Sequence, residues 1–94
     1  MDTYFLKQKT PGEITSLISR RLRVIRKRRK LSQQELSKKS GVSLGSVKRF
    51  ETTGQISLTS LTKIAIALEC ENELLELFEA PPYQSIQEIV DGQD

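Results

Sequence analysis

The chain has 94 residues, enough for one small domain; 36% of them are hydrophobic and 29% charged, a balance that favours a folded globule. It contains one cysteine, Cys70, and no histidine, which excludes a disulfide framework and argues against zinc-type metal sites. The lone cysteine predicts a reducing cytoplasm, and no cofactor is expected. No apolar run approaches the roughly 20 residues of a membrane span, which predicts no membrane contact.

The net charge of +3 is distributed unevenly along the chain. Residues 1–31 carry a net charge of +8, residues 32–56 carry +2 and residues 57–94 carry −7. The basic half suits a polyanionic partner and the acidic half would avoid one. Two solvated surfaces of opposite sign are the alternative interpretation.

Five helices are predicted, and the first follows an N-terminal arm of residues 1–10. Thr10 and Glu13 have the spacing of a capping box around Pro11, which suits the first position of a helix. Apolar residues then recur at helical intervals, so this helix should run to about Arg29. Its expected inward face consists of Ile14, Leu17, Ile18, Leu22 and Ile25.

The second and third helices are short and are joined through a glycine. Ser32 caps the second helix and Gly41 ends it, while Ser43 caps the third, which ends near Thr52 before Gly54. Helices of about eight residues are marginal in isolation, so packing on the flanking helices must hold them. The expected inward residues are Leu31, Leu36, Val42, Val47 and Phe50. This pattern is the sequence form of a helix-turn-helix, with N-terminal N–H groups available to phosphate.

A fourth helix begins at Ser57, and a fifth, shorter helix stops before Pro81 and Pro82. The expected inward face of the fourth helix is Leu58, Leu61, Ile64, Ala65 and Leu68. The fifth helix carries the apolar residues Leu74, Leu75, Leu77 and Phe78. We therefore predict a bundle over residues 11–79 and a C-terminal tail over residues 80–94. In the tail, Ser85 and Glu88 have the spacing of a capping pair, and the apolar residues are Tyr83, Ile86, Ile89 and Val90.

The stretch "LSQQELSKKSGVSLGSVKRFETTG" resembles the helix-turn-helix of the lambda-repressor/Cro-like regulators, also called the xenobiotic-response-element family. The matching features include the Leu-Ser-Gln opening, the Gly-Val-Ser turn and the Val47 and Phe50 anchors. "SLTSLTKIAIALE" is similar to that family's fourth helix, and the resemblance covers roughly residues 14–78. It implies an all-α, compact five-helix bundle. It also implies a bacterial or phage transcriptional repressor, nucleoid-associated when bound, that holds a pseudo-palindromic operator in double-stranded DNA as a homodimer.

The resemblance also implies roles for individual residues. Arg26 and Glu51 stand where the family has a structural ion pair, and Gln33 stands where a glutamine contacts phosphate or an outer base. The base-reading positions correspond to Leu44, Gly45, Ser46 and Arg49. The first two depart from the family, because neither side chain can replace the hydrogen bonds of the glutamines often found there.

Physical chemistry separates readers of bases from residues that bind phosphate. Arg49 can donate two hydrogen bonds to a guanine, and Leu44 can contact a thymine methyl group. The residues better placed for phosphate are Ser32, Gln33, Ser43, Lys48, Thr52 and Thr53. A solvated helix face is the alternative for Lys48 and Arg49, and a packing role is the alternative for Leu44.

Partners other than DNA are predicted from the acidic half of the chain. The apolar residues Leu74, Leu75, Leu77 and Phe78 form a candidate dimer surface, with ordinary core as the alternative. The tail resembles those of HipB-type antitoxins, which repress their own operon and hold a kinase-like toxin. An interaction module that sequesters a HipA-type kinase is therefore the alternative function. The absence of histidine and of a phosphate-cradling glycine loop predicts that the protein is not an enzyme.

Overall fold

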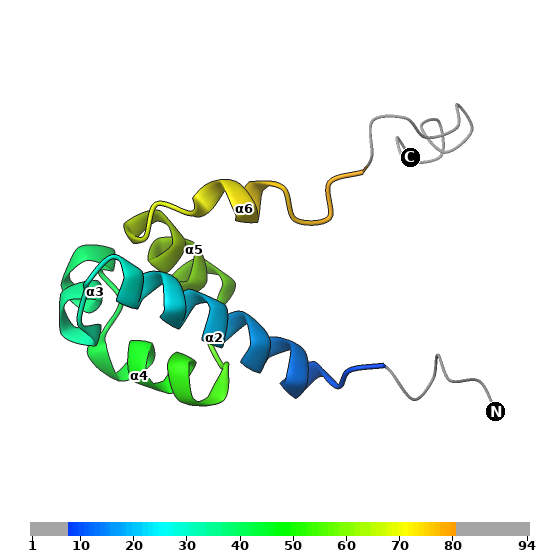
Figure 1. Cartoon of the computed structure of the whole chain (residues 1–94), viewed down its shortest axis with the longest axis horizontal. Helices are drawn as coiled ribbons and strands as arrows, with labels where there is room; N and C mark the ends of the chain where they lie inside the picture. The colour runs from blue at the N-terminus through cyan, green and yellow to red at the C-terminus, as the bar shows by residue number, and fades with distance from the viewer. Residues whose placement is uncertain (1–7, 81–94) are drawn as a thin grey trace.

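The computed structural model describes residues 8–80, which form five helices and no strand (Figure 1). The helices are α2 (Pro11–Arg28), α3 (Gln33–Ser40), α4 (Leu44–Thr53), α5 (Leu58–Ala67) and α6 (Glu71–Leu75). The predicted all-α, five-helix fold is therefore confirmed for this part of the chain. Of the tail, to which a toxin-binding role was assigned, only Ala80 lies among the described residues.

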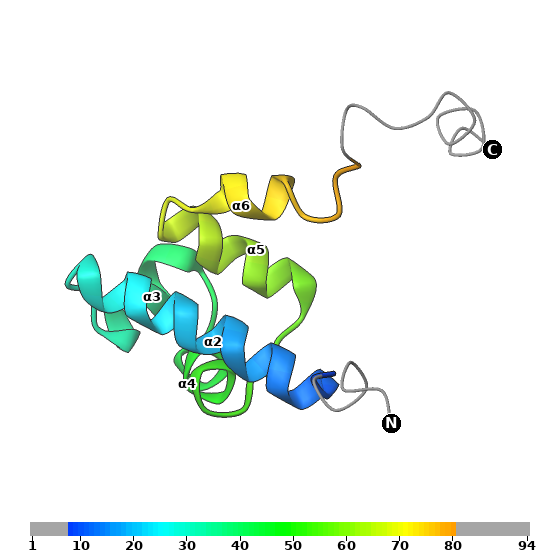
Figure 2. The same ribbon diagram turned by 45° about the vertical axis from the view of Figure 1, so that its right-hand side comes forward.

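The core lies where α3 and α4 meet α5. Leu36 of α3 and Phe50 of α4 are each 2% exposed, and Val47 is fully buried. The buried cluster comprises Leu36, Val42, Val47, Phe50, Ile64, Ala67 and Leu68. α2 packs across α4, and α3 packs on both α4 and α5, as two views of the ribbon show (Figures 1 and 2). Burial between neighbouring helices thus holds two elements that are too short to be stable alone.

The turn between α3 and α4 is held by local hydrogen bonds. Gly41 ends α3 with a φ of +76°, in the left-handed region that favours glycine. The Ser37 hydroxyl donates to the carbonyl of Val42 at 2.6 Å, and the Val42 N–H donates to the Ser40 hydroxyl at 3.1 Å. These bonds fix the angle at which α4 leaves α3.

The inward face predicted for the first helix is only half correct. Ile14 is 46% exposed and Ile18 is 38% exposed, whereas Leu22 and Ile25 pack against the core. The reason is length, because the 18 residues of α2 extend over about 27 Å and α4 has only ten residues. The first turns of α2 extend past the helices that could cover them (Figure 1).

The last helix is shorter than the sequence predicted. α6 ends at Leu75, so Leu77 and Phe78 lie beyond it, and Phe78 adopts a φ of +59°. Glu76 and Glu79 follow the helix and oppose the negative end of its dipole, which disfavours further turns. No helix of residues 8–80 is long and apolar enough to cross a membrane.

One further prediction about the inward faces was wrong. Leu58, expected in the core, is 71% exposed, because it occupies the first position of α5, at the edge of the packed region.

Candidate nucleic-acid interface

A buried ion pair joins α2 to α4. The Arg26 guanidinium donates two hydrogen bonds to the carboxylate of Glu51, at 2.7 and 2.9 Å, and a third to the carbonyl of Leu31 at 2.8 Å. The Arg26 side chain is 8% exposed and that of Glu51 is 5% exposed. Two charges so well removed from water require full hydrogen bonding, which this arrangement provides. The pair therefore fixes the orientation of α4 against the bundle.

Gln33, at the start of α3, also belongs to this network. Its side-chain NH2 group donates one of its two N–H bonds to Glu51 Oε1 at 2.9 Å, which fixes the amide against the ion pair and leaves one N–H for a phosphate. Burial by itself would raise the pKa of Glu51. Hydrogen bonds from Arg26 and Gln33, together with the charges of Arg26 and Arg23, outweigh burial and hold the pKa below its ordinary value.

The helix N-termini differ in their charge. At the start of α3, the Glu35 carboxylate accepts a hydrogen bond from the Ser32 N–H at 2.8 Å, which places a negative charge where a phosphate would bind. The first turns of α4 and α5 contain no acidic residue, and only the hydroxyls of Ser43 and Ser57 cap them. The positive dipole ends of α4 and α5 are thus open to an anion, whereas that of α3 is compensated.

Arg49 lies on the exposed face of α4 and is held by a neighbour. Its Nε and Nη2 donate to Gln55 Oε1 at 3.2 and 2.6 Å. A depression of about 350 Å³ surrounds this pair and reaches the cap of α5. It is lined by Ser46, Arg49, Gln55, Ile56, Ser57 and Ser60. The middle of α4, the loop after it and the N-terminus of α5 therefore form one continuous surface, on which polar side chains surround Ile56.

A comparison with protein families agrees with this geometry. The family model of the Cro/C1-type HTH DNA-binding domain matches residues 21–82, about two thirds of the chain. The protein belongs to the Cro/C1-type HTH family. No curated protein and no solved structure gave a significant match. The matched range contains α3 and α4, the two helices joined at Gly41, and identifies the protein as a DNA-binding regulator.

Several residues predicted to contact DNA make bonds within this Cro/C1-type domain. The hydroxyls of Thr52 and Thr53 donate to the carbonyls of Lys48 and Arg49, at 2.8 and 2.7 Å, which uses their only O–H donors. Leu44 is half-buried, whereas the positions of Gly45, Ser46 and Lys48 are exposed. Ser43 donates its hydroxyl to Ser46 at 2.8 Å, and the Ser46 hydroxyl has no acceptor among the described residues.

Sequence reasoning did not include three residues that line the depression at Arg49, namely Gln55, Ser57 and Ser60. They follow Gly54 and therefore lie outside the predicted helix-turn-helix. One signal was present in the sequence, because Ser57 precedes a first helical turn with no carboxylate, as Ser43 does. The contact between Arg49 and Gln55 has no such signal, since it depends on the path of the chain around Gly54.

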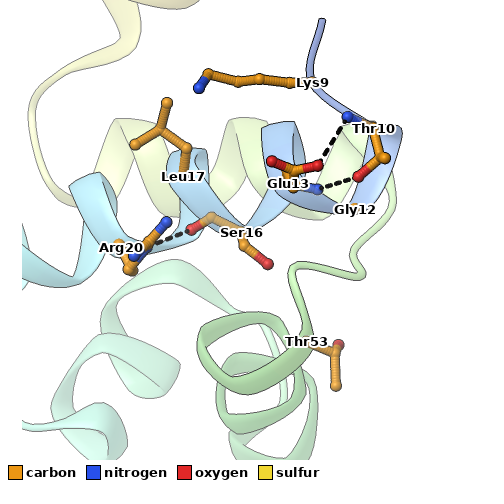
Figure 3. Close-up of a pocket in the computed structure, with 8 residues that line it drawn as sticks. All are labelled: Lys9, Thr10, Gly12, Glu13, Ser16, Leu17, Arg20 and Thr53. Carbon is orange, nitrogen blue, oxygen red and sulfur yellow. Dashed lines mark hydrogen bonds between the residues drawn. The ribbon is translucent and has the colours of Figure 1, made fainter. Parts of the chain in front are cut away.

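A second polar depression of the domain does not suit an anion. It has a volume of about 490 Å³ and lies between the start of α2 and Thr53 at the end of α4 (Figure 3). Lys9 and Arg20 line it, but so does the Glu13 carboxylate, which accepts a hydrogen bond from the Thr10 N–H at 3.2 Å. That carboxylate occupies the N-terminus of α2 and would repel a phosphate.

Proposed function

We propose that the protein is a sequence-specific transcriptional repressor that binds a pseudo-palindromic operator as a dimer. The observation that carries this proposal is the surface of α4, where an N-terminus free of carboxylates lies next to an arginine oriented by Gln55. In a helix-turn-helix, the second helix enters the major groove with its N-terminal residues at the base edges. α4 is that helix, and a bound dimer would block access to the DNA it covers.

The roles on this surface follow from the donors that remain unbound. The Arg49 Nη1 group makes no hydrogen bond among the described residues and can reach a guanine together with Nη2, while Ser46 offers a hydroxyl. The backbone N–H groups at the starts of α4 and α5 are suited to phosphates on either side of the groove. The Lys48 ammonium group adds positive charge to this surface, but its flexible side chain does not fix the geometry of a contact with DNA.

The dimer is proposed to form through the outer face of α6. Leu75 is 74% exposed and Phe78 is 96% exposed, and together with Leu58 and Ile66 they border an apolar groove of about 530 Å³. Leu74 and Leu77 line the same groove. A second copy is its natural occupant, because two-fold symmetry pairs the same surface with itself and sets two α4 helices about 34 Å apart along DNA.

Replacing Arg49 with alanine tests whether this residue reads sequence. Operators are first selected from genomic fragments with the wild-type protein, and binding is then measured to variants at each base pair. We expect the Arg49→Ala variant to lose about 1–3 kcal/mol of discrimination, roughly 5- to 150-fold, at one base pair per half-site. The matched control, Lys48→Ala, should weaken binding to all operators about equally. It should also lower the slope of log affinity against log salt concentration by about one. An unchanged ranking of operators by Arg49→Ala would contradict the assignment.

Replacing Gln55 with leucine tests the orientation of Arg49. The leucine removes the acceptor of both Arg49 hydrogen bonds but keeps the charge on α4. We expect a smaller loss at the same base pair, about 1 kcal/mol or roughly fivefold, because the guanidinium must then be ordered on binding. In the Arg49→Ala background, Gln55→Leu should have no further effect at that base pair. Additive effects of the two changes would show that Gln55 contacts DNA by itself.

A further inference from the structure

Most of the cationic side chains of α2 lie beside a carboxylate. Arg26 is buried with Glu51, and Arg29 is paired with Glu69 at 2.8 Å. The cations that share a depression with an acidic residue are Arg20 with Glu13, Arg21 with Glu73, and Arg28 with Glu69 and Glu73. In each of these places an external anion would meet a negative charge as well as a positive one.

Arg23 differs from these cations. Its side chain is 52% exposed, and its only ion pair among residues 8–80 is a long one, with its Nε 4.0 Å from Glu51 Oε1. The Glu51 carboxylate already accepts two hydrogen bonds from Arg26 and one from Gln33. The charge of Glu51 is therefore met by Arg26. The Arg23 guanidinium makes no hydrogen bond within residues 8–80, so its donors are available to a further anion.

Gln33 lies at the same point of the surface. Its amide donates to the Glu51 oxygen that faces Arg23, so side chains from α3 and α2 meet at one atom. The second N–H of the amide is available to the same anion as Arg23. Glu35, the acidic residue in the first turn of α3, accepts from the Ser32 N–H. It follows Gln33 by two positions, about 200° around the helix, and therefore leaves α3 on the opposite side.

The position of this pair suits the DNA backbone. In a helix-turn-helix, the second helix enters the major groove while the first crosses the sugar–phosphate chain. Gln33 is the first residue of α3, and Arg23 lies beside it on α2. Lys27 follows Arg23 by four positions, so it lies on the same face of α2 and adds a positive charge.

We propose that Arg23 and Gln33 together bind one phosphate of the DNA backbone, supported by the buried Arg26–Glu51 pair. The guanidinium supplies the charge and the amide supplies an N–H from a second helix, so the contact sets the position of the domain on the duplex without reading a base. This inference rests on the proposed operator binding, because α4 must lie in the groove for α3 to meet the backbone.

The salt dependence of binding tests the role of Arg23. Arg23→Gln should lower the slope of log affinity against log salt concentration by about 0.9, and the affinity at about 0.1 M salt by about fivefold to tenfold. The ranking of operator variants should not change. The matched control is Arg20→Gln, which removes the same charge from a side chain whose depression also contains Glu13 (Figure 3). We expect the control to change the slope by less than about 0.3, and equal changes in the two variants would overturn the proposal.

Arg23→Lys separates a phosphate contact from a role in packing. The lysine keeps the charge, so this variant should keep the wild-type slope to within about 0.3. Helical circular dichroism in the same buffers checks that each variant is folded, as expected for a side chain that is half exposed. A slope in Arg23→Lys as low as that in Arg23→Gln would contradict the proposed contact.

Neutral backbone linkages locate the phosphate itself. Operators that carry a methylphosphonate at one backbone position at a time are titrated with the wild type, Arg23→Gln and Gln33→Leu. At one linkage per half-site, the neutral group should weaken wild-type binding about fivefold and Arg23→Gln binding less than about twofold. Gln33→Leu should lose sensitivity at that same linkage. Wild-type sensitivity of Arg23→Gln at every linkage would overturn the proposal, as would different linkages for the two residues.

Failure of operator reading would be recognised separately. A wild-type protein that bound all duplexes with equal affinity would contradict the proposed function. The salt slopes of Arg23→Gln and Arg20→Gln on any one duplex would still decide whether Arg23 binds a phosphate.

Discussion

The Glu51→Gln variant is expected to lose about 3–5 kcal/mol of its free energy of unfolding, although the side chain keeps its size. The change leaves the Arg26 guanidinium buried with no opposing charge, while the side chain is only 8% exposed. Small domains have about 5–15 kcal/mol of stability in total, so this loss is a large fraction. Urea unfolding followed by helical circular dichroism at neutral pH measures it.

An exposed pair in the same protein provides the matched control. Arg29 donates to the Glu69 carboxylate at 2.8 Å, close to the 2.7 Å between Arg26 and Glu51. The side chains of Arg29 and Glu69, however, are 41% and 67% exposed. Glu69→Gln should therefore cost less than about 1 kcal/mol, because water and salt screen an exposed pair. If the two variants lost similar amounts of stability, burial would not determine how much the Arg26–Glu51 pair contributes to the free energy of unfolding.

The same carboxylate predicts an acid limit to stability. The pKa of Glu51 is lowered in the folded protein from the ordinary value of 4.5, so the folded state binds its proton less readily than the unfolded chain. The stabilisation is fully present above pH 4.5 and is lost as the pH falls through the lowered pKa. Between neutral pH and low pH, Glu51→Gln should lose less stability than the wild type. Parallel losses in the two proteins would contradict this linkage.

The Gly54→Ala variant is expected to be destabilised by about 3 kcal/mol, more than a substitution at any other glycine of the helix ends. Gly54 has a φ of +79°, and a Cβ atom there would lie 2.9 Å from the backbone carbonyl carbon of Thr15. That atom belongs to α2 and cannot move aside as a flexible side chain would. The cost thus combines a left-handed backbone with a steric overlap between α4 and α2.

Gly41 separates these two contributions. Its φ of +76° is nearly the same, but no atom lies within 4 Å of a Cβ built there. Gly41→Ala should cost only about 1–2 kcal/mol, the penalty of the left-handed conformation. Thermal unfolding of the two variants measures the difference. If both variants lost the same stability, close packing of α4 on α2 at Gly54 would not contribute.

Both sites of large expected effect also position the surface that we propose reads DNA. Glu51 and Gly54 belong to the C-terminal end of α4, and each contacts α2. Arg49 lies on the same helix and is held by Gln55, the residue after Gly54. A loosened end of α4 would release the orientation of Arg49 as well. Operator discrimination should therefore fall in these variants even where the protein remains folded.

The local signals of this chain predicted its helices well. Thr10 with Glu13, and Ser32 with Glu35, mark two helix starts, and both capping boxes are present in the structure. Gly41 and Gly54 mark two helix ends, and both adopt the left-handed conformation. Such signals are readable because each involves residues within about four positions of one another. The fold class followed from them and from the resemblance to a known family.

Contacts between residues distant in the sequence were not readable in the same way. Gln33 turns its amide to Glu51, 18 positions away, and Ile14 and Ile18 remain exposed because no helix reaches them. Periodicity indicates which residues share a face of a helix, but packing determines which faces find a partner. The boundaries of the first four helices therefore follow from the amino-acid sequence, whereas the side-chain donors that remain exposed for a DNA partner follow from the assembled bundle.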